Sequence, residues 1–286
     1  MKRLTIQLFN CWLVLLSLTG CSNELPLQPS LGGETVRLGK LVTRMDAGSE
    51  QEWQWMADDV ITATTSGSSS LTATYTYGGD SQWGKADNAN FTIEKIGVDA
   101  ITLEFGSSTL TPDQSDAAKY HEVDYLKGKG AISLTTLGGT LGHQHCDLVL
   151  TITKGTGWVS DDEFTKAMAD ASCVFVANSG GGTTDLKPFH DGSTFRAILP
   201  PDNIVKGQNQ KIATLTFGSA TDTPELLRNY TATIVYTNEA SDLKNKRFIV
   251  IATLNTDCSV SITASINSWS TENVTNPYPG EPEATN

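Results

Sequence analysis

His143 and His145 form the pair whose type and spacing are best suited to chemistry. Two positions apart on a β-strand, their side chains would share one face and could bind a metal ion together. The sequence places no third histidine or carboxylate obviously beside them. We therefore interpret them as surface or interface histidines and expect no metal site.

The chain lacks the short motifs by which common enzyme classes position their reactive groups. It has no G-x-S-x-G elbow, no H-E-x-x-H, no P-loop and no dinucleotide fingerprint. Aspartates and glutamates are scattered, so a dispersed carboxylate pair of the glycosidase kind stays open, although nothing singles one out. We expect a protein that is not an enzyme and needs no cofactor.

The N-terminus has the pattern of a secretory signal peptide. Lys2 and Arg3 precede an apolar run over residues 8–18, which is shorter than the ~20 apolar residues that span a bilayer. The run ends in Leu18-Thr19-Gly20-Cys21, which resembles a bacterial lipobox. We predict a signal peptide over residues 1–20 and lipid attachment, such as palmitate, at Cys21. The alternative is an ordinary signal followed by a chance cysteine.

The length and the net charge limit the number of domains and the classes of partner of the remaining chain. Removing residues 1–20 leaves 286 − 20 = 266 residues, enough for two ordinary domains or one large one. The net charge is −12, and losing Lys2 and Arg3 makes it −14. This acidic balance argues against nucleic acid and anionic membrane surfaces as partners.

The cysteines and tryptophans allow two interpretations each. Cys146, Cys173 and Cys258 remain beside the signal and lipid cysteines, so at most one intramolecular disulfide can form. We interpret all three as buried small hydrophobic residues. Exposed tryptophans could stack on sugars, but packing in the core is the commoner fate and the one we predict. The tryptophans of the mature chain are Trp53, Trp55, Trp83, Trp158 and Trp269.

Alternating apolar and polar residues recur along the chain and predict half-exposed antiparallel strands. Residues 22–33 indicate an extended tether, and residues 34–43 a strand that breaks at Gly39. Phe248 to Leu254 is a continuous apolar run, typical of a central strand. The other apolar stripes are Ile101/Leu103/Phe105, Leu148/Leu150/Ile152, Tyr230/Ala232/Ile234/Tyr236 and Val260/Ile262/Ala264/Ile266.

Helix is scarce. Ser160 and Glu163 form a capping box that predicts a helix over residues 161–171, and residues 115–127 could hold another. Many short strands with rare helices indicate an all-β protein built from β-sandwiches. The polar tail over residues 271–286 contains three prolines and is predicted to be flexible.

Several spaced segments resemble the fimbrillin family, the FimA-like and Mfa-like pilins of Bacteroidales. The segments that carry the resemblance are Thr43-Arg44, Trp53 to Ile61, Tyr75 to Trp83, Thr111 to Ser115, Asp124-Tyr125-Leu126, His143 with Leu148, Leu150 and Ile152, Ala197 to Pro201, and Ile266-Asn267-Ser268-Trp269. In the second of these, Ala57 or Asp58 stands where the family has glycine.

The resemblance implies two transthyretin-like antiparallel β-sandwich domains in tandem, and export to the outer membrane surface as a lipoprotein. It also implies cleavage by a trypsin-like protease after an arginine, for which Arg44 matches best and Arg37 second. We expect a lipidated tether and removable strand over residues 21–44, an N-terminal domain over 45–130, and a C-terminal domain over 131–270.

These expectations combine into a hypothesis about assembly. Cleavage after Arg44 would remove the strand at 34–43 and expose unpaired main-chain groups, which are a template for a strand of another subunit. The function predicted is a structural subunit of a cell-surface fimbrium, or pilus, that supports adhesion. The alternative is an uncleaved lipid-anchored adhesin or accessory subunit that binds glycans or a host protein.

Overall fold

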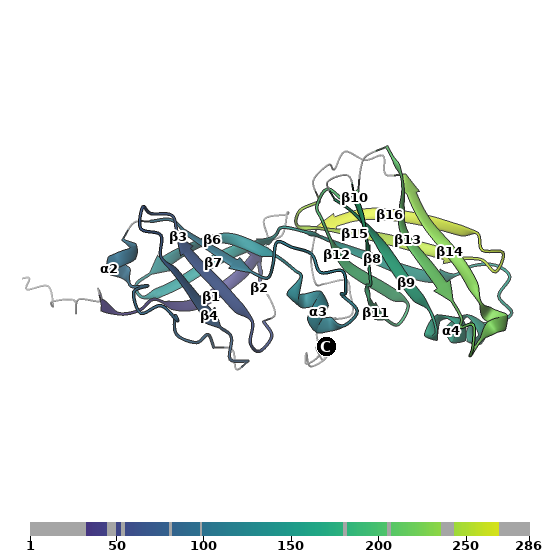
Figure 1. The fold of residues 1–286 in the computed structure, drawn as a ribbon, viewed down its shortest axis with the longest axis horizontal. Coiled ribbons are helices and arrows are strands. Elements are labelled where there is room, and N and C mark those ends of the chain that lie inside the picture. The colour runs from purple at the N-terminus through teal and green to yellow at the C-terminus, as the bar shows by residue number, and fades with distance from the viewer. Residues whose placement is uncertain are drawn as a thin grey trace, which may run out of the picture.

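The structure is a computed structural model that describes residues 33–44, 50–52, 55–79, 82–97, 99–179, 182–204, 207–235 and 243–268. It has two β-rich lobes joined end to end, with the short helix α3 (Ala117–Glu122) at the junction between them (Figure 1). The all-β sandwich class with few short helices is confirmed. None of the described helices is both long and apolar enough to span a membrane.

The first lobe contains a seven-stranded sheet in the order β2-β1-β7-β6-β5-β3-β4. Its strands are β1 (Arg37–Arg44), β2 (Glu50–Glu52), β3 (Val60–Thr65), β4 (Thr72–Thr76), β5 (Ile101–Phe105), β6 (Leu126–Ser133) and β7 (Thr136–His143). The sheet folds over one core, because Tyr75 of the edge strand β4 and Leu41 of β1, next to the opposite edge, belong to the same buried cluster.

The second lobe is a sandwich of a four-stranded and a five-stranded sheet. The four-stranded sheet has the order β10-β9-β13-β14 and the five-stranded sheet the order β11-β12-β8-β15-β16. The strands are β8 (Cys146–Lys154), β9 (Ser172–Ser179), β10 (Gly182–Leu186), β11 (Phe189–Asp191), β12 (Thr194–Leu199), β13 (Asn209–Phe217), β14 (Arg228–Val235), β15 (Lys246–Leu254) and β16 (Val260–Ser268). Inward-facing residues of both sheets form one hydrophobic core.

Two strand pairs depart from the predicted antiparallel arrangement. β1 pairs with β7 in parallel, and β15 pairs with β8 in parallel over its whole length. The alternation of apolar and polar residues predicts which side chains face the core, but the same alternation is expected for parallel and for antiparallel strands. Each parallel pair is separated by many intervening residues, as such connections require.

The domain boundary also differs from the prediction. Residue 130 lies inside β6, which pairs with β7 within the first sheet. The chain passes from the first sheet to the second at residues 144–145, between β7 and β8. The predicted first domain therefore ended one hairpin too early, and the strand at 34–43 is part of its sheet.

The helix predicted from the capping box is confirmed as α4 (Asp161–Ala169). Ser160 Oγ accepts a hydrogen bond from the Glu163 backbone N–H at 3.1 Å, and Ala167 and Met168 face the core. The segment 115–127 is helical only at α3 and then enters β6. The sequence did not predict α2 (Ile93–Ile96) or the 3₁₀ turn η2 (Pro224–Leu226).

Candidate strand-exchange site

Strand β1 is paired along both of its edges. On one side it runs parallel to β7, from Arg37 opposite Thr136 to Thr43 opposite Leu141. On the other side its end pairs with β2, and Arg37 forms an isolated bridge with Lys85. β1 is therefore an internal strand of the sheet, and we call the position that it occupies the slot.

The slot has an apolar floor. Val36, just before β1, is 1 % exposed, and Leu38 and Leu41 are 8 % and 2 % exposed. All three join the core cluster that contains Leu137 and Leu141 of β7. Burying a side chain of this size stabilises a fold by about 1.5–3 kcal/mol. If β1 left, these sites would open to water together with the main-chain edge of β7.

Tyr75 of β4 ties the start of this segment to the far side of the sheet. Its hydroxyl donates a buried hydrogen bond of 3.0 Å to the Val36 carbonyl. Burial, reinforced by the charge of Asp87, raises the pKa of Tyr75 far above its usual value. The hydroxyl therefore stays protonated and remains a donor at any physiological pH.

The two predicted cleavage residues occupy different places on β1. Arg44 is the last residue of the strand, and the chain then enters residues 45–49, outside the described residues. Arg37 is the first residue of the strand and is paired on both sides. Proteases cut most readily at exposed segments outside regular structure; Arg44 lies beyond the register with β7, which ends at Thr43, whereas Arg37 lies within that register. Cys21 lies outside the described residues.

The histidines predicted to lie at the surface or at an interface are buried at the junction between the lobes. His143 and His145 are 3 % and 7 % exposed, and His143 Nδ1 lies 2.9 Å from Asp124 Oδ2. Burial lowers the pKa of His145. Within the described ranges, no group of three or more His, Cys, Asp or Glu side chains is arranged to hold a metal ion.

The cysteines and tryptophans divide between core and surface. Cys146 and Cys173 are buried free thiols whose pKa values are raised by burial, whereas Cys258 is free and exposed.

Trp158 is buried as predicted, and its Nε1 donates to the Leu254 carbonyl at 2.8 Å. Trp55 and Trp83 are half-buried and contact each other edge to face at 4.9 Å. Trp53 and Trp269 lie outside the described residues.

A buried charged cluster at the junction was missed by the sequence analysis. Asp147 of β8 is fully buried, and its Oδ2 accepts from Arg196 Nη2 at 2.9 Å and from Arg247 Nε at 2.6 Å. The hydroxyl of Tyr120, on α3, donates to Asp147 Oδ1 at 2.8 Å. Burial alone would raise the pKa of Asp147, but the two arginine charges and this hydroxyl outweigh it and hold the pKa at about 2.

The side chain of Gln114 also contributes to this junction, through hydrogen bonds to the backbone of β12. The Gln114 side chain accepts from the Ile198 N–H at 2.7 Å and donates to the Ile198 carbonyl at 3.0 Å. Gln114 thus pairs with β12 as an added strand would. Tyr120, Val123 and Ile198 form a small buried apolar cluster beside it. The segment between β5 and β6 therefore fixes the first lobe to the five-stranded sheet of the second.

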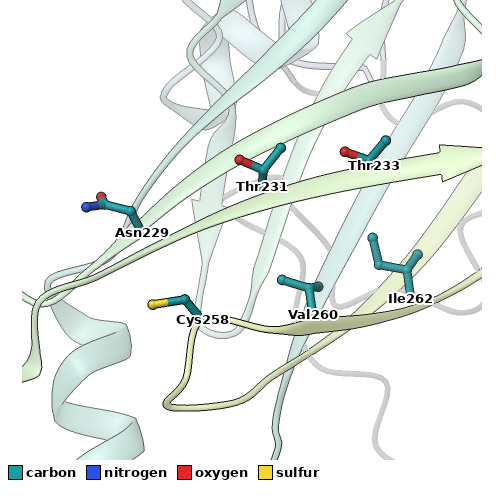
Figure 2. Close-up of a pocket in the computed structure, with 6 residues that line it drawn as sticks. All are labelled: Asn229, Thr231, Thr233, Cys258, Val260 and Ile262. Atoms are coloured by element: carbon teal, nitrogen blue, oxygen red, sulfur yellow. The ribbon is translucent and has the colours of Figure 1, made fainter.

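A second groove lies between two edge strands of the second lobe, one from each sheet. β14 and β16 face each other across a pocket of about 550 Å³, into which Val260 and Ile262 point from β16 (Figure 2). The other lining residues are mostly polar and include Asn229, Thr231 and Thr233. Apolar side chains in pockets give strand addition its specificity, so the slot of β1, with its three buried apolar residues, is the stronger candidate.

Comparison with known proteins gives the fold. No family model matches the chain, and no curated protein matches it. A solved structure from Bacteroides uniformis, whose name proposes a cell adhesion protein, has 13 % identity and a TM-score of 0.53, covering 81 % of this chain and 97 % of its own. A similarly named protein from Bacteroides ovatus has 14 % identity and a TM-score of 0.51, covering 84 % and 99 %.

A looser likeness extends to a fimbrial protein. The tip fimbrial protein Mfa3 from Porphyromonas gingivalis, with its C-terminus truncated, has 9 % identity and a TM-score of 0.42, covering 82 % of this chain and 99 % of its own. At such identities, the two Bacteroides structures with the higher scores show that this two-lobed fold occurs in other proteins.

Proposed function

We propose that this chain is a structural subunit of a cell-surface fimbrium, exported as a lipoprotein and assembled by donor-strand addition in support of adhesion. In this proposal, a lipid on Cys21 holds the protein at the outer membrane surface until a protease cuts after Arg44. Residues 21–44 then leave, and a strand of another pilin subunit takes the place of β1. The partners are other pilin subunits, the outer membrane through the lipid, and a host glycan or protein receptor.

The observation that carries the proposal is the position of β1. The strand is paired on both edges, contributes Leu38 and Leu41 to the core, and ends at Arg44. A cut at its end would convert a strand held within the chain into one held only by noncovalent contacts. Its departure would leave β7 with an unpaired edge above an apolar floor.

An unpaired strand edge of this kind pairs readily with a strand of another chain. Unpaired N–H and C=O groups template pairing with another chain, and burying alternate side chains makes that pairing specific. If each subunit receives one strand and donates another, the contact is head to tail and produces an open filament. The likeness in fold to two Bacteroides proteins whose names propose cell adhesion supports this role.

The proposal includes that the chain is not an enzyme. Assembly by strand addition requires no catalytic residue. The buried charged residues of the junction already have structural roles, since Asp147 pairs with Arg196 and Arg247, and Asp124 lies beside His143.

The direct test is the N-terminal sequence of protein extracted from the cell surface. We expect chains that begin at Met45, and filaments visible by electron microscopy with antibody against the mature protein. Arg44→Ala should leave the chain at its lipidated Cys21 and abolish the filaments. Arg37→Ala is the matched control on the same strand and should be processed normally. Recovery of wild-type chains only from Cys21 would overturn assembly by cleavage.

A second candidate function is an uncleaved, lipid-anchored adhesin or accessory subunit. The half-buried rings of Tyr77, Trp55 and Trp83 favour it, because they contact one another with ring centroids 4.9 and 5.2 Å apart and each stays partly exposed. Aromatic faces of this kind stack on sugars. Glycan-array binding that disappears in Trp83→Ala and survives in Leu134→Ala, a residue 73 % exposed in the β6–β7 turn, would support this candidate.

A further inference from the structure

Strand β1 contains a β-bulge. Leu38 lies opposite Leu137 of β7, but the next paired residue, Leu41, lies opposite Gly139. Two residues of β1, Gly39 and Lys40, therefore face a single residue of β7. Such an insertion disrupts the hydrogen-bond ladder and leaves the extra residue unpaired.

The bulge changes the spacing of the buried side chains. Val36, Leu38 and Leu41 face the core, while Arg37 and Lys40 are exposed. Their spacing is i, i+2, i+5, whereas a regular strand places side chains on one face at i, i+2, i+4. Glycine at position 39 leaves room for the neighbouring strand, because a Cβ there would lie 2.3 Å from Thr136 Cγ2 and would displace that side chain.

The partner strand has no matching irregularity. Leu137 and Leu141 of β7 are both fully buried, and Gly139 lies midway between them in the same alternation. β7 pairs with β6 in an unbroken register from Thr136 to His143. The edge that β1 would leave behind is therefore suited to a straight strand with strict alternation.

The direction of pairing weakens β1 further. β1 runs parallel to β7, and parallel ladders are slightly less stable per residue than antiparallel ones. β1 thus combines a bulge with the less stable ladder, although it occupies a slot that a regular strand could fill.

We propose that β1 is a replaceable occupant, and that the slot binds more tightly a bulge-free strand with apolar residues at i, i+2 and i+4. This inference rests on the proposed function, since it describes which strand succeeds β1. It also limits the source of that strand. The C-terminal tail of a second copy, residues 269–286, has no such alternation and contains Pro277, Pro279 and Pro282, which cannot donate to a ladder. Residues 269–286 of a second copy are therefore not the strand that succeeds β1.

The experiment uses the full mature chain, made without lipid by Cys21→Ser, with a specific protease site in place of residues 45–49. After cleavage, β1 stays in its slot as a separate peptide. Labelled synthetic peptides then compete for the slot, and their uptake is followed by fluorescence polarisation and mass spectrometry. Three peptides are compared: the native residues 34–44, the same peptide lacking Gly39, and residues 269–286.

Deleting Gly39 converts the i, i+2, i+5 spacing into strict alternation without adding an apolar residue. We expect this peptide to bind at least about tenfold more tightly than the native peptide, and the tail peptide not to displace β1. A full chain lacking Gly39 should also retain its own β1 longer after cleavage. Equal or weaker binding of the peptide that lacks Gly39 would overturn the inference, and so would displacement by the tail peptide. Failure of every peptide, including the native one, would instead contradict the proposed function, because the slot would then not exchange strands.

Discussion

The hydroxyl of Tyr75 donates a hydrogen bond of 3.0 Å to the carbonyl of Val36, across the interior of the first lobe. Tyr75 belongs to β4, at one edge of the seven-stranded sheet, and Val36 precedes β1, near the other edge. The bond therefore joins the two ends of a sheet that folds over a single core. It also holds the one strand that assembly would remove.

Tyr75→Phe should weaken the attachment of Val36 and β1 to the rest of the first lobe. Phenylalanine keeps the buried ring but leaves the Val36 carbonyl without this donor, which costs about 1–3 kcal/mol for a buried group. We expect the free energy of unfolding in urea to fall by that amount, and β1 to leave a cleaved chain faster. Tyr125→Phe is the matched control, because its hydroxyl bonds the partly exposed Glu104 at 3.1 Å. Equal effects of the two substitutions would contradict this role of Tyr75.

Leu41→Ala should destabilise β1 more than any change on its exposed face. Leu41 is 2 % exposed within the core of the first lobe, and replacing a buried leucine by alanine costs about 2–5 kcal/mol. Lys40→Ala, one residue away and exposed, should change the stability by less than about 0.5 kcal/mol. Urea unfolding of both variants measures the difference. A large effect of Lys40→Ala would mean that the bulge is oriented differently.

Local patterns predicted local elements well. The alternation of Ile101, Leu103 and Phe105 became β5, with those residues buried, and the capping box at Ser160 became the start of α4. In both cases the signal lies within a few neighbouring residues. The break at Gly39 in the sequence likewise coincides with the bulge in β1.

Features set by distant residues were not predicted. The parallel pairing of β1 with β7 depends on chain direction, which alternation does not record. Asp147 alternates with Leu148, Leu150 and Ile152, which would place it on the polar face of β8, although it is fully buried. Its outer face is covered by Tyr120 on α3, and no residue near Asp147 in the sequence indicates that cover. Gly128 of β6 lies so close to β7 that a Cβ there would meet the Thr140 carbonyl oxygen, but a glycine in the sequence does not indicate which strand approaches it.

Asp147→Ala should strongly destabilise the junction between the lobes. The substitution leaves the guanidinium groups of Arg196 and Arg247, each 3 % exposed, without their shared carboxylate. Removing one partner of a buried ion pair typically costs about 3–5 kcal/mol. Asp185→Ala, an exposed position on β10, is the control and should stay within about 0.5 kcal/mol of wild type. Thermal unfolding with separate probes in each lobe would show whether the two lobes then unfold independently.

The contribution of Asp147 to stability should vanish in acid. Its pKa is held at about 2 in the folded protein by Arg196, Arg247 and Tyr120, against an ordinary value near 4 in the unfolded chain. Because the folded pKa is depressed, this stabilisation is present above pH ~4 and is lost as the pH falls through ~2. A shift of this size corresponds to a contribution on the order of 2 kcal/mol.

Asp147→Asn separates this effect from the other carboxylates of the acidic chain. The difference in unfolding free energy between wild type and variant should be constant from pH 7 to about 5 and should shrink between pH 4 and 2. The interaction is buried, so 1 M salt should reduce it little, unlike the exposed pair of Lys119 and Asp113. If the variant does not fold, carbon-detected NMR titration of Asp147 in the wild type gives its pKa directly. A midpoint near the ordinary value would mean that the two arginines do not stabilise the charged carboxylate.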